Sequence, residues 1–151
     1  MKILLPFDGS APALDAVRFA IRLGDDGLHV SVVLANVQEP ASLYELMVAH
    51  DPQVIEQVSA AAGANTLQAA KALLEAAGIA YETEVATGDP ANTLVDILEN
   101  YGCDMVVMGA SGTSALRSAL LGSVSNELLH SAGVPVTIVK GLPQANADMV
   151  E

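Results

Sequence analysis

Short apolar runs alternate along this chain with longer segments in which apolar residues recur every three or four positions. Five of the short runs have the length and the Val, Ile and Leu content of strands, and the segments between them have the period of amphipathic helices. The expected strands are residues 2–7, 28–37, 79–87, 104–109 and 134–139. Strands that alternate with helices are typical of an α/β protein with a parallel sheet.

The expected helices carry start and stop signals. Ser or Asp is a favoured N-cap, Pro is favoured in the first turn, and Gly ends a helix. The expected starts and ends are Ser10 and Gly24, Asp51-Pro52 and Gly78, Asp89-Pro90 and Gly102, and Ser123 and about Ala132. The side chains expected to face the core are Leu14, Val17, Ile21, Val54, Ile55, Val58, Ala62, Leu73, Leu74, Leu94, Ile97, Leu98 and Tyr101.

Two of the expected strands differ in how charged and apolar residues are distributed along them. Residues 79–87 place charge on one face, which favours an edge strand, whereas residues 104–109 are continuously apolar and are expected to be buried on both faces.

Composition narrows the class of protein. The 151 residues fit one domain, expected at 1–142 with a polar tail at 143–151, and 52% apolar against 16% charged residues excludes disorder. No apolar run reaches the roughly 18 residues of a membrane span. Six Lys and Arg against eighteen Asp and Glu give a net charge of -12, which disfavours nucleic acid as a partner. One cysteine, Cys103, and an N-terminus without signal-peptide features favour a soluble, cytosolic protein.

One dense group of glycines and hydroxyl residues follows the fourth expected strand. Gly109, Gly112, Gly122 and Ser123 begin at the carboxyl end of that strand and finish at a helix N-terminus. Ligands of open α/β sheets bind at this edge, and unpaired N–H groups at a helix start stabilise anions. Ser111, Thr113, Ser123 and Ser125 add hydroxyl donors, and Arg117 is the one cation of the stretch. The pattern predicts a phosphate-binding loop.

This spacing resembles the nucleotide-binding motif of the universal stress protein family. The segment Ile3 to Ser10 is similar to that family's first strand and turn, and Val106 to Gly112 and Val134 to Val139 are similar to its fourth and fifth strands. The resemblance implies an open, Rossmann-like five-stranded parallel sheet of order 3-2-1-4-5, similar to the adenine nucleotide alpha hydrolases, with helices on both faces. It also implies ATP, with Mg²⁺ carried by the phosphates, and a homodimer formed through residues 134–139.

The resemblance assigns roles to particular positions. Pro6, Phe7 and Asp8 would face adenosine, Val37 would contact adenine through its backbone, and the segment after the fourth strand would hold ribose and phosphates. With the hydroxyls and the cation of the loop, the candidate binding residues are Pro6, Phe7, Asp8, Val37, Met108, Gly109, Ser111, Gly112, Arg117, Gly122, Ser123, Val124 and Ser125. No catalytic residue and no protein-held metal is expected.

Plainer interpretations exist for several of these residues. Asp8 could simply cap the turn before the first helix, and the glycine loop could be an ordinary connection. His29, His50 and His130 lack metal-ligand spacing, and nothing near Cys103 predicts a lowered thiol pKa.

Two rival functions use the same topology. A receiver-like phospho-acceptor domain would use Asp8, Ser111 and Lys140, but the chain lacks paired acids after the first strand and an acceptor Asp at the end of the third. A true ATP-splitting enzyme of the adenine-hydrolase type would need a base and a leaving-group cation near the phosphates, and the loop contains no Lys or His. Slow ATP hydrolysis or autophosphorylation stays an alternative, with the Ser and Thr residues at 111–125 as the candidate acceptors. We therefore expect an ATP-binding regulator of stress physiology that acts as a nucleotide-dependent switch on an unidentified protein target.

Overall fold

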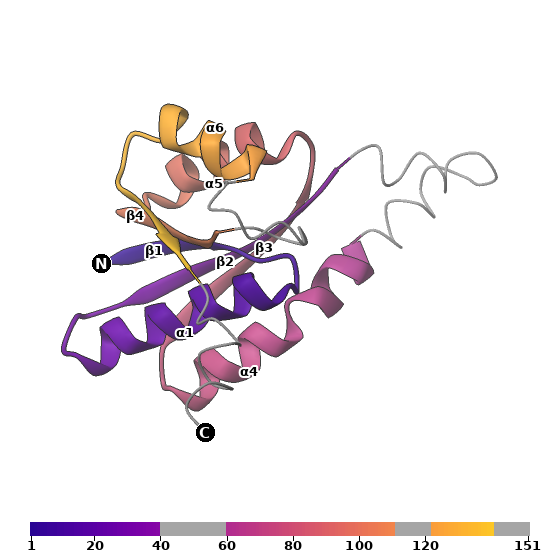
Figure 1. The fold of residues 1–151 in the computed structure, drawn as a ribbon. Coiled ribbons are helices and arrows are strands. Elements are labelled where there is room, and N and C mark those ends of the chain that lie inside the picture. Colours follow the sequence, from indigo (N-terminus) through magenta and orange to yellow (C-terminus); the bar gives the residue numbers. More distant parts are fainter. Residues whose placement is uncertain (40–59, 111–121, 141–151) are drawn as a thin grey trace, which may run out of the picture.

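Five parallel strands form a single sheet in the order β3-β2-β1-β4-β5 (Figure 1). The computed structural model describes residues 1–39, 60–110 and 122–140. The strands are β1 (Lys2–Pro6), β2 (Ser31–Gln38), β3 (Ala80–Thr87), β4 (Met105–Gly109) and β5 (Val136–Val139). The expected order and the central place of the first and fourth strands are confirmed. All five strands are shorter than expected by one or two residues, because pairing with the neighbouring strand, not hydrophobicity, sets their ends.

Helices cover both faces of the sheet. They are α1 (Ala11–Asp25), α4 (Gln68–Ala76), α5 (Pro90–Tyr101) and α6 (Ser123–Ser131). α1 and α4 lie on one face, and α5 and α6 lie on the other (Figure 1). Successive residues of β1 pack into the cores on opposite faces of the sheet. Ile3 and Leu5 pack toward α1, and Leu4 packs toward α5 and α6. Buried apolar side chains on both faces of the central strands are typical of parallel sheets.

Small residues form the centre of the α1 interface. Ala13, Ala16, Val17 and Ala20 are buried, whereas Leu14 and Ile21, which we expected there, are half-buried at its sides. Short side chains at the centre let the helix lie close to the sheet, so the larger apolar residues pack at the margins.

Most expected helix ends are confirmed. Ser10 accepts a hydrogen bond from the Ala13 amide and Asp89 accepts one from the Asn92 amide, so both are N-caps. Gly78 and Gly102 have left-handed backbones with φ of 73° and 64°. α1 continues one residue past Gly24, and the left-handed glycine after it is Gly27, at φ 108°. The expectation that Ser123 caps the last helix is wrong: Gly122 is the N-cap and Ser123 is the first helical residue.

The helical segment before β3 uses a different face from the one expected. Residues 60–66 are helical, and the buried positions there and in α4 are Gly63, Leu67, Ala70 and Leu74, spaced by three or four residues. Ala62, which we placed in the apolar stripe, is exposed. The glycine takes the inward position because nothing larger fits. Some of our expectations fall outside the described residues. They concern the helix start at Asp51 and Pro52, the apolar stripe residues Val54, Ile55 and Val58, and the tail at 143–151.

No helix within the described ranges is both long and apolar enough to span a bilayer.

Candidate functional site

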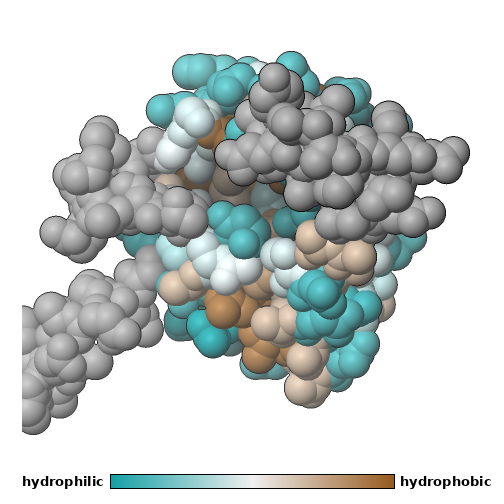
Figure 2. All heavy atoms as spheres, turned by 90° about the vertical axis from the view of Figure 1, so that its right-hand side faces the viewer, coloured by the Kyte–Doolittle hydropathy of each residue, from teal (hydrophilic) through white to brown (hydrophobic). Residues whose placement is uncertain are grey.

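A pocket of about 420 Å³ lies at the carboxyl edge of the sheet. The ends of β1, β2 and β4 form its floor, and the first turns of α1, α5 and α6 form its walls. β1 and β4 are neighbours, and the chain leaves β1 toward β2 on one side and leaves β4 toward β5 on the other. Ligands of open α/β sheets bind at such switch points. Figure 2 looks onto this edge, where apolar atoms line a hollow between the grey segments. The volume falls in the range of small-molecule sites.

Ten of the thirteen candidate binding residues line this pocket. They are Pro6, Phe7, Asp8, Val37, Met108, Gly109, Gly122, Ser123, Val124 and Ser125. The other three, Ser111, Gly112 and Arg117, lie outside the described residues.

Six further residues line the pocket that we did not predict: Ser10, Ala13, Ala35, Glu39, Pro90 and Leu94. Two sequence signals could have found most of them. Ala35 and Glu39 are each two positions from Val37, on the same face of β2 or just beyond its end. Pro90 and Leu94 lie in the first turns of a helix that begins just after a strand, at the same edge of the sheet.

The end of β2 presents backbone groups to the pocket. The Phe7 amide donates to the Ala35 carbonyl at 2.8 Å, and the Gly88 amide donates to the Gln38 carbonyl at 3.0 Å. Alternate residues of a strand between two parallel neighbours direct their peptide groups to alternate sides. Val37 therefore faces the same side as Ala35, toward β1, but β1 has already ended at Pro6. The N–H and C=O of Val37 are thus left for a ligand, and a planar ring with one donor and one acceptor could form hydrogen bonds with both.

Asp8 serves the turn and the pocket at once. Its Oδ1 accepts a hydrogen bond from the Ser10 amide at 2.9 Å, as the plainer interpretation expects, and its exposed side chain also lines the pocket. Gly9, at φ 83°, completes this turn.

Three helices begin at the pocket, and they differ in their caps. The Ser10 hydroxyl caps α1 and the Asp89 carboxylate caps α5. At α6, Gly122 makes no side-chain cap bond. The first N–H groups of a helix need a partner, and an anion is a favourable one. Of these three helix starts at the pocket, α6 is the one suited to a ligand, and Ser125 lies buried beside it.

The two glycines at the pocket have different reasons to be glycine. A Cβ on Gly109 would lie 2.5 Å from the Pro12 carbonyl oxygen, so close packing of α1 on β4 excludes any side chain. A Cβ on Gly122 would meet no described atom within 4 Å. Fold packing therefore explains Gly109 without a ligand, and it does not explain Gly122.

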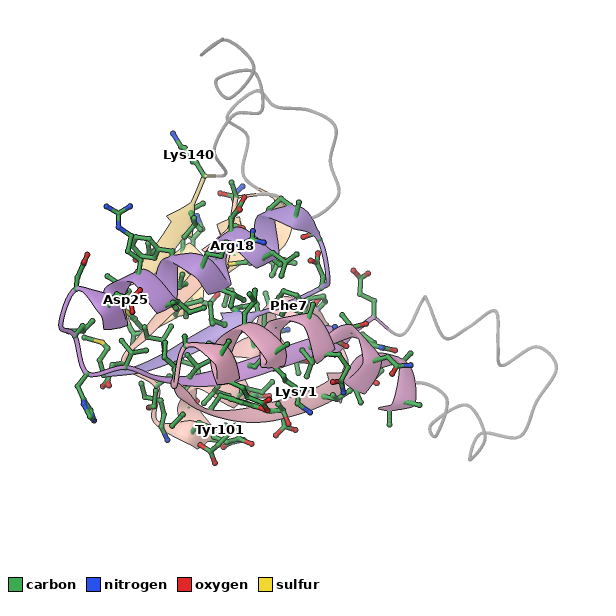
Figure 3. All side chains as sticks on the ribbon, turned by 90° about the horizontal axis from the view of Figure 1, so that it is seen from below. Phe7, Arg18, Asp25, Lys71, Tyr101 and Lys140 are labelled. Atoms are coloured by element: carbon green, nitrogen blue, oxygen red, sulfur yellow. The ribbon has the colours of Figure 1, made fainter. Side chains whose placement is uncertain are left out.

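The described part of the pocket wall is acidic. It contains Asp8 and Glu39, and none of its described residues is Lys, Arg or His. Figure 3 shows Arg18 on α1, Lys71 on α4 and Lys140 just after β5, and none of the three lines the pocket. Arg18 pairs with Asp15 at 3.3 Å. A polyanion here would need compensation from backbone amides, from a cation or from residues outside the described ranges.

Cys103, His29 and His130 are not at this pocket, and His50 lies outside the described residues. Cys103 is buried against the α5 and α6 core, and burial raises the pKa of its thiol, which keeps it protonated. His29 and His130 are exposed and line no part of it. Across residues 1–39, 60–110 and 122–140, no three His, Cys, Asp or Glu side chains come together as metal ligands would.

Comparison with known proteins gives one consistent result. The family model described as the Universal stress protein family matches residues 1–140. Universal stress protein MJ0531 of Methanocaldococcus jannaschii is 31% identical over 139 residues, which cover 92% of this chain and 81% of that protein. The solved structure of hypothetical protein MJ0577 from the same organism has a TM-score of 0.79 at 25% identity, with 95% of this chain and 97% of that chain covered.

Two further solved structures share the fold and are described with a bound nucleotide. A universal stress protein in complex with cAMP has a TM-score of 0.63 at 24% identity and covers 92% of this chain and 95% of its own. A family protein from Arabidopsis thaliana with AMP bound has a TM-score of 0.66 at 18% identity, with coverages of 97% and 98%. With the family match over residues 1–140 and the sheet order found above, this chain belongs to the universal stress protein family.

Proposed function

We propose that this protein binds an adenine nucleotide, ATP in its magnesium form, in the pocket at the carboxyl edge of the sheet. One observation carries the proposal. The peptide groups of Val37 and the uncapped start of α6 lie at the same cavity, so one ligand with a hydrogen-bonding base and an anionic end could use both. The structures described with AMP and cAMP support the class of ligand, since they share this fold.

Magnesium follows from the charges of the pocket. Asp8 and Glu39 would lie near a triphosphate that itself carries several negative charges. Backbone amides of α6 and Mg²⁺ on the phosphates would offset this repulsion, and Arg117 is the candidate side-chain cation. Ser111 and Gly112 complete the proposed phosphate contacts.

Calorimetry and thermal unfolding test the proposal together. Millimolar Mg-ATP should give a binding heat and raise the melting temperature, because a ligand at 100 times its Kd adds about 2.7 kcal/mol to the free energy of unfolding. GTP is the control for the base, ATP with EDTA is the control for magnesium, and AMP and cAMP report the preferred phosphate. No heat and no shift with any adenine nucleotide would reject the proposal.

We propose a regulatory rather than an enzymatic role for the bound nucleotide. Rapid phosphoryl transfer needs cations around the transferred group besides the metal, and the described pocket residues supply none. Bound ATP should persist for many minutes, and the ATP-loaded form would be recognised by a protein target in the cytosol. The alternative is slow hydrolysis or autophosphorylation on the hydroxyls between 111 and 125. A turnover near the enzyme median of roughly 10 per second, lost in Arg117→Ala, would place the protein among the enzymes.

The receiver-like alternative loses support from Asp89. This residue is the first acid after β3, and its carboxylate caps α5 through the Asn92 amide at 3.1 Å, so it does not stand at a strand end as a phospho-acceptor would.

A further inference from the structure

Asn36 is a buried polar side chain that no sequence pattern singles out. It is 6% exposed and lies in β2, on the face toward α1 and α4. Its Nδ2 donates to the Phe7 carbonyl at 3.0 Å, and its Oδ1 accepts from Gln38 Nε2 at 3.3 Å. The Phe7 carbonyl can only accept, so the NH₂ end of the Asn36 amide is the end that faces it.

The Phe7 carbonyl begins the turn that lines the pocket. β1 ends at Pro6, so the regular ladder no longer holds the chain at the carbonyl of Phe7. The Phe7 amide still donates to the Ala35 carbonyl. At the Phe7 carbonyl, the Asn36 side chain supplies the donor that the next ladder bond would otherwise supply. The next residue is Asp8, whose carboxylate bonds the Ser10 amide at the start of α1.

The helical segment 60–66 supports Asn36 and the turn from behind. A Cβ on Gly63 would lie 3.0 Å from Asn36 Oδ1 and 2.4 Å from Val85 Cγ1, so the backbone of Gly63 packs directly against the amide. The Thr66 methyl lies 3.4 Å from the position that a Cβ on Gly9 would take. With this packing the Asn36 amide is enclosed, and its hydrogen bond to Phe7 forms away from water.

We infer that Asn36 is a positioning residue of the nucleotide pocket. It holds the Phe7 carbonyl to β2, and thereby keeps the Phe7 and Asp8 wall in its binding position before any ligand arrives. The inference rests on the proposed function for its ligand, but the hydrogen bond and the turn can be examined without one. Preorganisation of this kind favours binding because the ordering cost is met during folding.

Asn36→Asp is the sharpest test, because it keeps the shape and makes the donor depend on pH. An ionised carboxylate cannot donate and would face the Phe7 oxygen, whereas a protonated carboxyl can donate to it. Burial should raise the pKa of the new carboxyl. Asp8 directly follows Phe7, and Glu39 lies three positions after Asn36. Residues 60–66 contain no titratable side chain, and Val85 is paired with Asn36 on β3.

The measurement is the ratio of the Kd of the variant to that of the wild type for Mg-ATP at each pH, which cancels the titration of the ligand and of the native groups. We expect a ratio of about 10 at pH 8, the worth of one buried hydrogen bond, that falls toward 1 at pH 5. Asn100→Asp is the matched control, since it adds the same charge at an exposed position near the other end of α5. Asn36→Thr, neutral and too short to reach Phe7, should weaken binding equally at both pH values, and it replaces Asn36→Asp if that variant is unfolded at pH 8.

Amide hydrogen exchange of the ligand-free proteins gives the independent readout. The Ser10 amide, bonded to Asp8, should exchange faster in the Asn36 variants, while amides within α5 keep their wild-type rates. Wild-type protein that binds no nucleotide would reject the proposed function, and the exchange rates would still decide whether Asn36 holds the turn. A folded Asn36→Asp protein with a wild-type Kd and wild-type Ser10 exchange at pH 8 would overturn the inference.

Discussion

At Gly122 the backbone has φ of -68° and ψ of 165°, a conformation that any amino acid can adopt. From the sequence we expect a side chain here to block binding, through either a left-handed backbone or a clash with the phosphate. The first reason is wrong, and the second stays a prediction. Gly122 is therefore a position where binding and folding can be separated.

The first prediction concerns Gly122→Val. A Cβ there meets no described atom within 4 Å, so the expected loss in the free energy of unfolding is only that of a poorer N-cap, about 1 kcal/mol. The Mg-ATP melting shift should disappear, since the side chain would enter the path of the phosphates. Denaturant unfolding and calorimetry on one sample check both halves. A variant that binds Mg-ATP like the wild type would show that α6 does not hold the phosphates.

The opposite behaviour is expected of Gly109→Ala. A Cβ would lie 2.5 Å from the Pro12 oxygen and 2.6 Å from its carbonyl carbon, and the backbone of α1 can move away only by disturbing the helix interface. We expect a loss of about 1–3 kcal/mol in the free energy of unfolding, the usual cost of overpacking. Urea unfolding measures it, with Gly122→Ala as the control. Equal stability of the two variants would contradict the close approach of α1 to β4.

Among the elements, the two edge strands of the sheet differ in charge. β3 carries Glu82 and Glu84 on the side toward α5, and the Tyr101 hydroxyl donates to Glu84 at 2.8 Å. Lys2 lies 3.7 Å from Glu82 and over the Tyr101 ring at 6.0 Å from its centroid. Charges on an edge strand discourage pairing with another chain. β5, at the other edge, is half-buried throughout and consists of Val136, Thr137, Ile138 and Val139.

The bond between Tyr101 and Glu84 predicts a stability change at alkaline pH. The hydrogen bond to Glu84, and then burial and the Glu84 charge, raise the pKa of Tyr101 above 10.0. A group whose pKa is raised by folding stabilises the folded state below its unfolded pKa and loses that contribution as pH rises through the folded value. At pH 8 the free energy of unfolding of the wild type should exceed that of Tyr101→Phe by about 0.5 kcal/mol, since the hydrogen bond is only partly buried.

This difference in the free energy of unfolding should decline above about pH 10. Urea unfolding between pH 8 and pH 11 checks it. Tyr81, whose pKa is also raised, by its hydrogen bond to Glu75, is present in both proteins and cancels in the comparison. A difference that stays constant across this range would show that the Tyr101 hydroxyl does not depend on Glu84.

For the molecule as a whole, we predict a homodimer that pairs two β5 strands antiparallel about a two-fold axis. β4 occupies one side of β5, through bonds such as the Ala110 amide to the Val139 carbonyl at 3.0 Å, and within the described chain no strand occupies the other. Thr137→Lys should weaken the dimer, because it places like charges close together near that axis. Sedimentation at tens of micromolar should show a wild-type dimer and a shift of the variant toward monomer. A monomeric wild type would refute the arrangement.

Local signals along the chain are enough to determine the elements and the edge of the sheet at which the pocket lies. The period of the apolar residues, the caps Ser10 and Asp89 and the stop glycine Gly102 each depend on neighbours within about four residues of the chain. Strand ends of a parallel sheet lie at one edge, so the place of the glycine loop at that edge follows from the sequence. The grouping of Phe7, Val37 and Met108 with this loop came from the family resemblance.

The side chains that support that site were decided by tertiary packing. The Asn36 amide meets the Phe7 carbonyl across 29 positions of the chain, and Gly63 meets Val85 from a different layer. Similarly, Gly109 on β4 is required by the close approach of Pro12 on α1. No local pattern encodes these contacts, because they depend on the distance and rotation at which helices settle on the sheet, and those are fixed by packing over the whole interface.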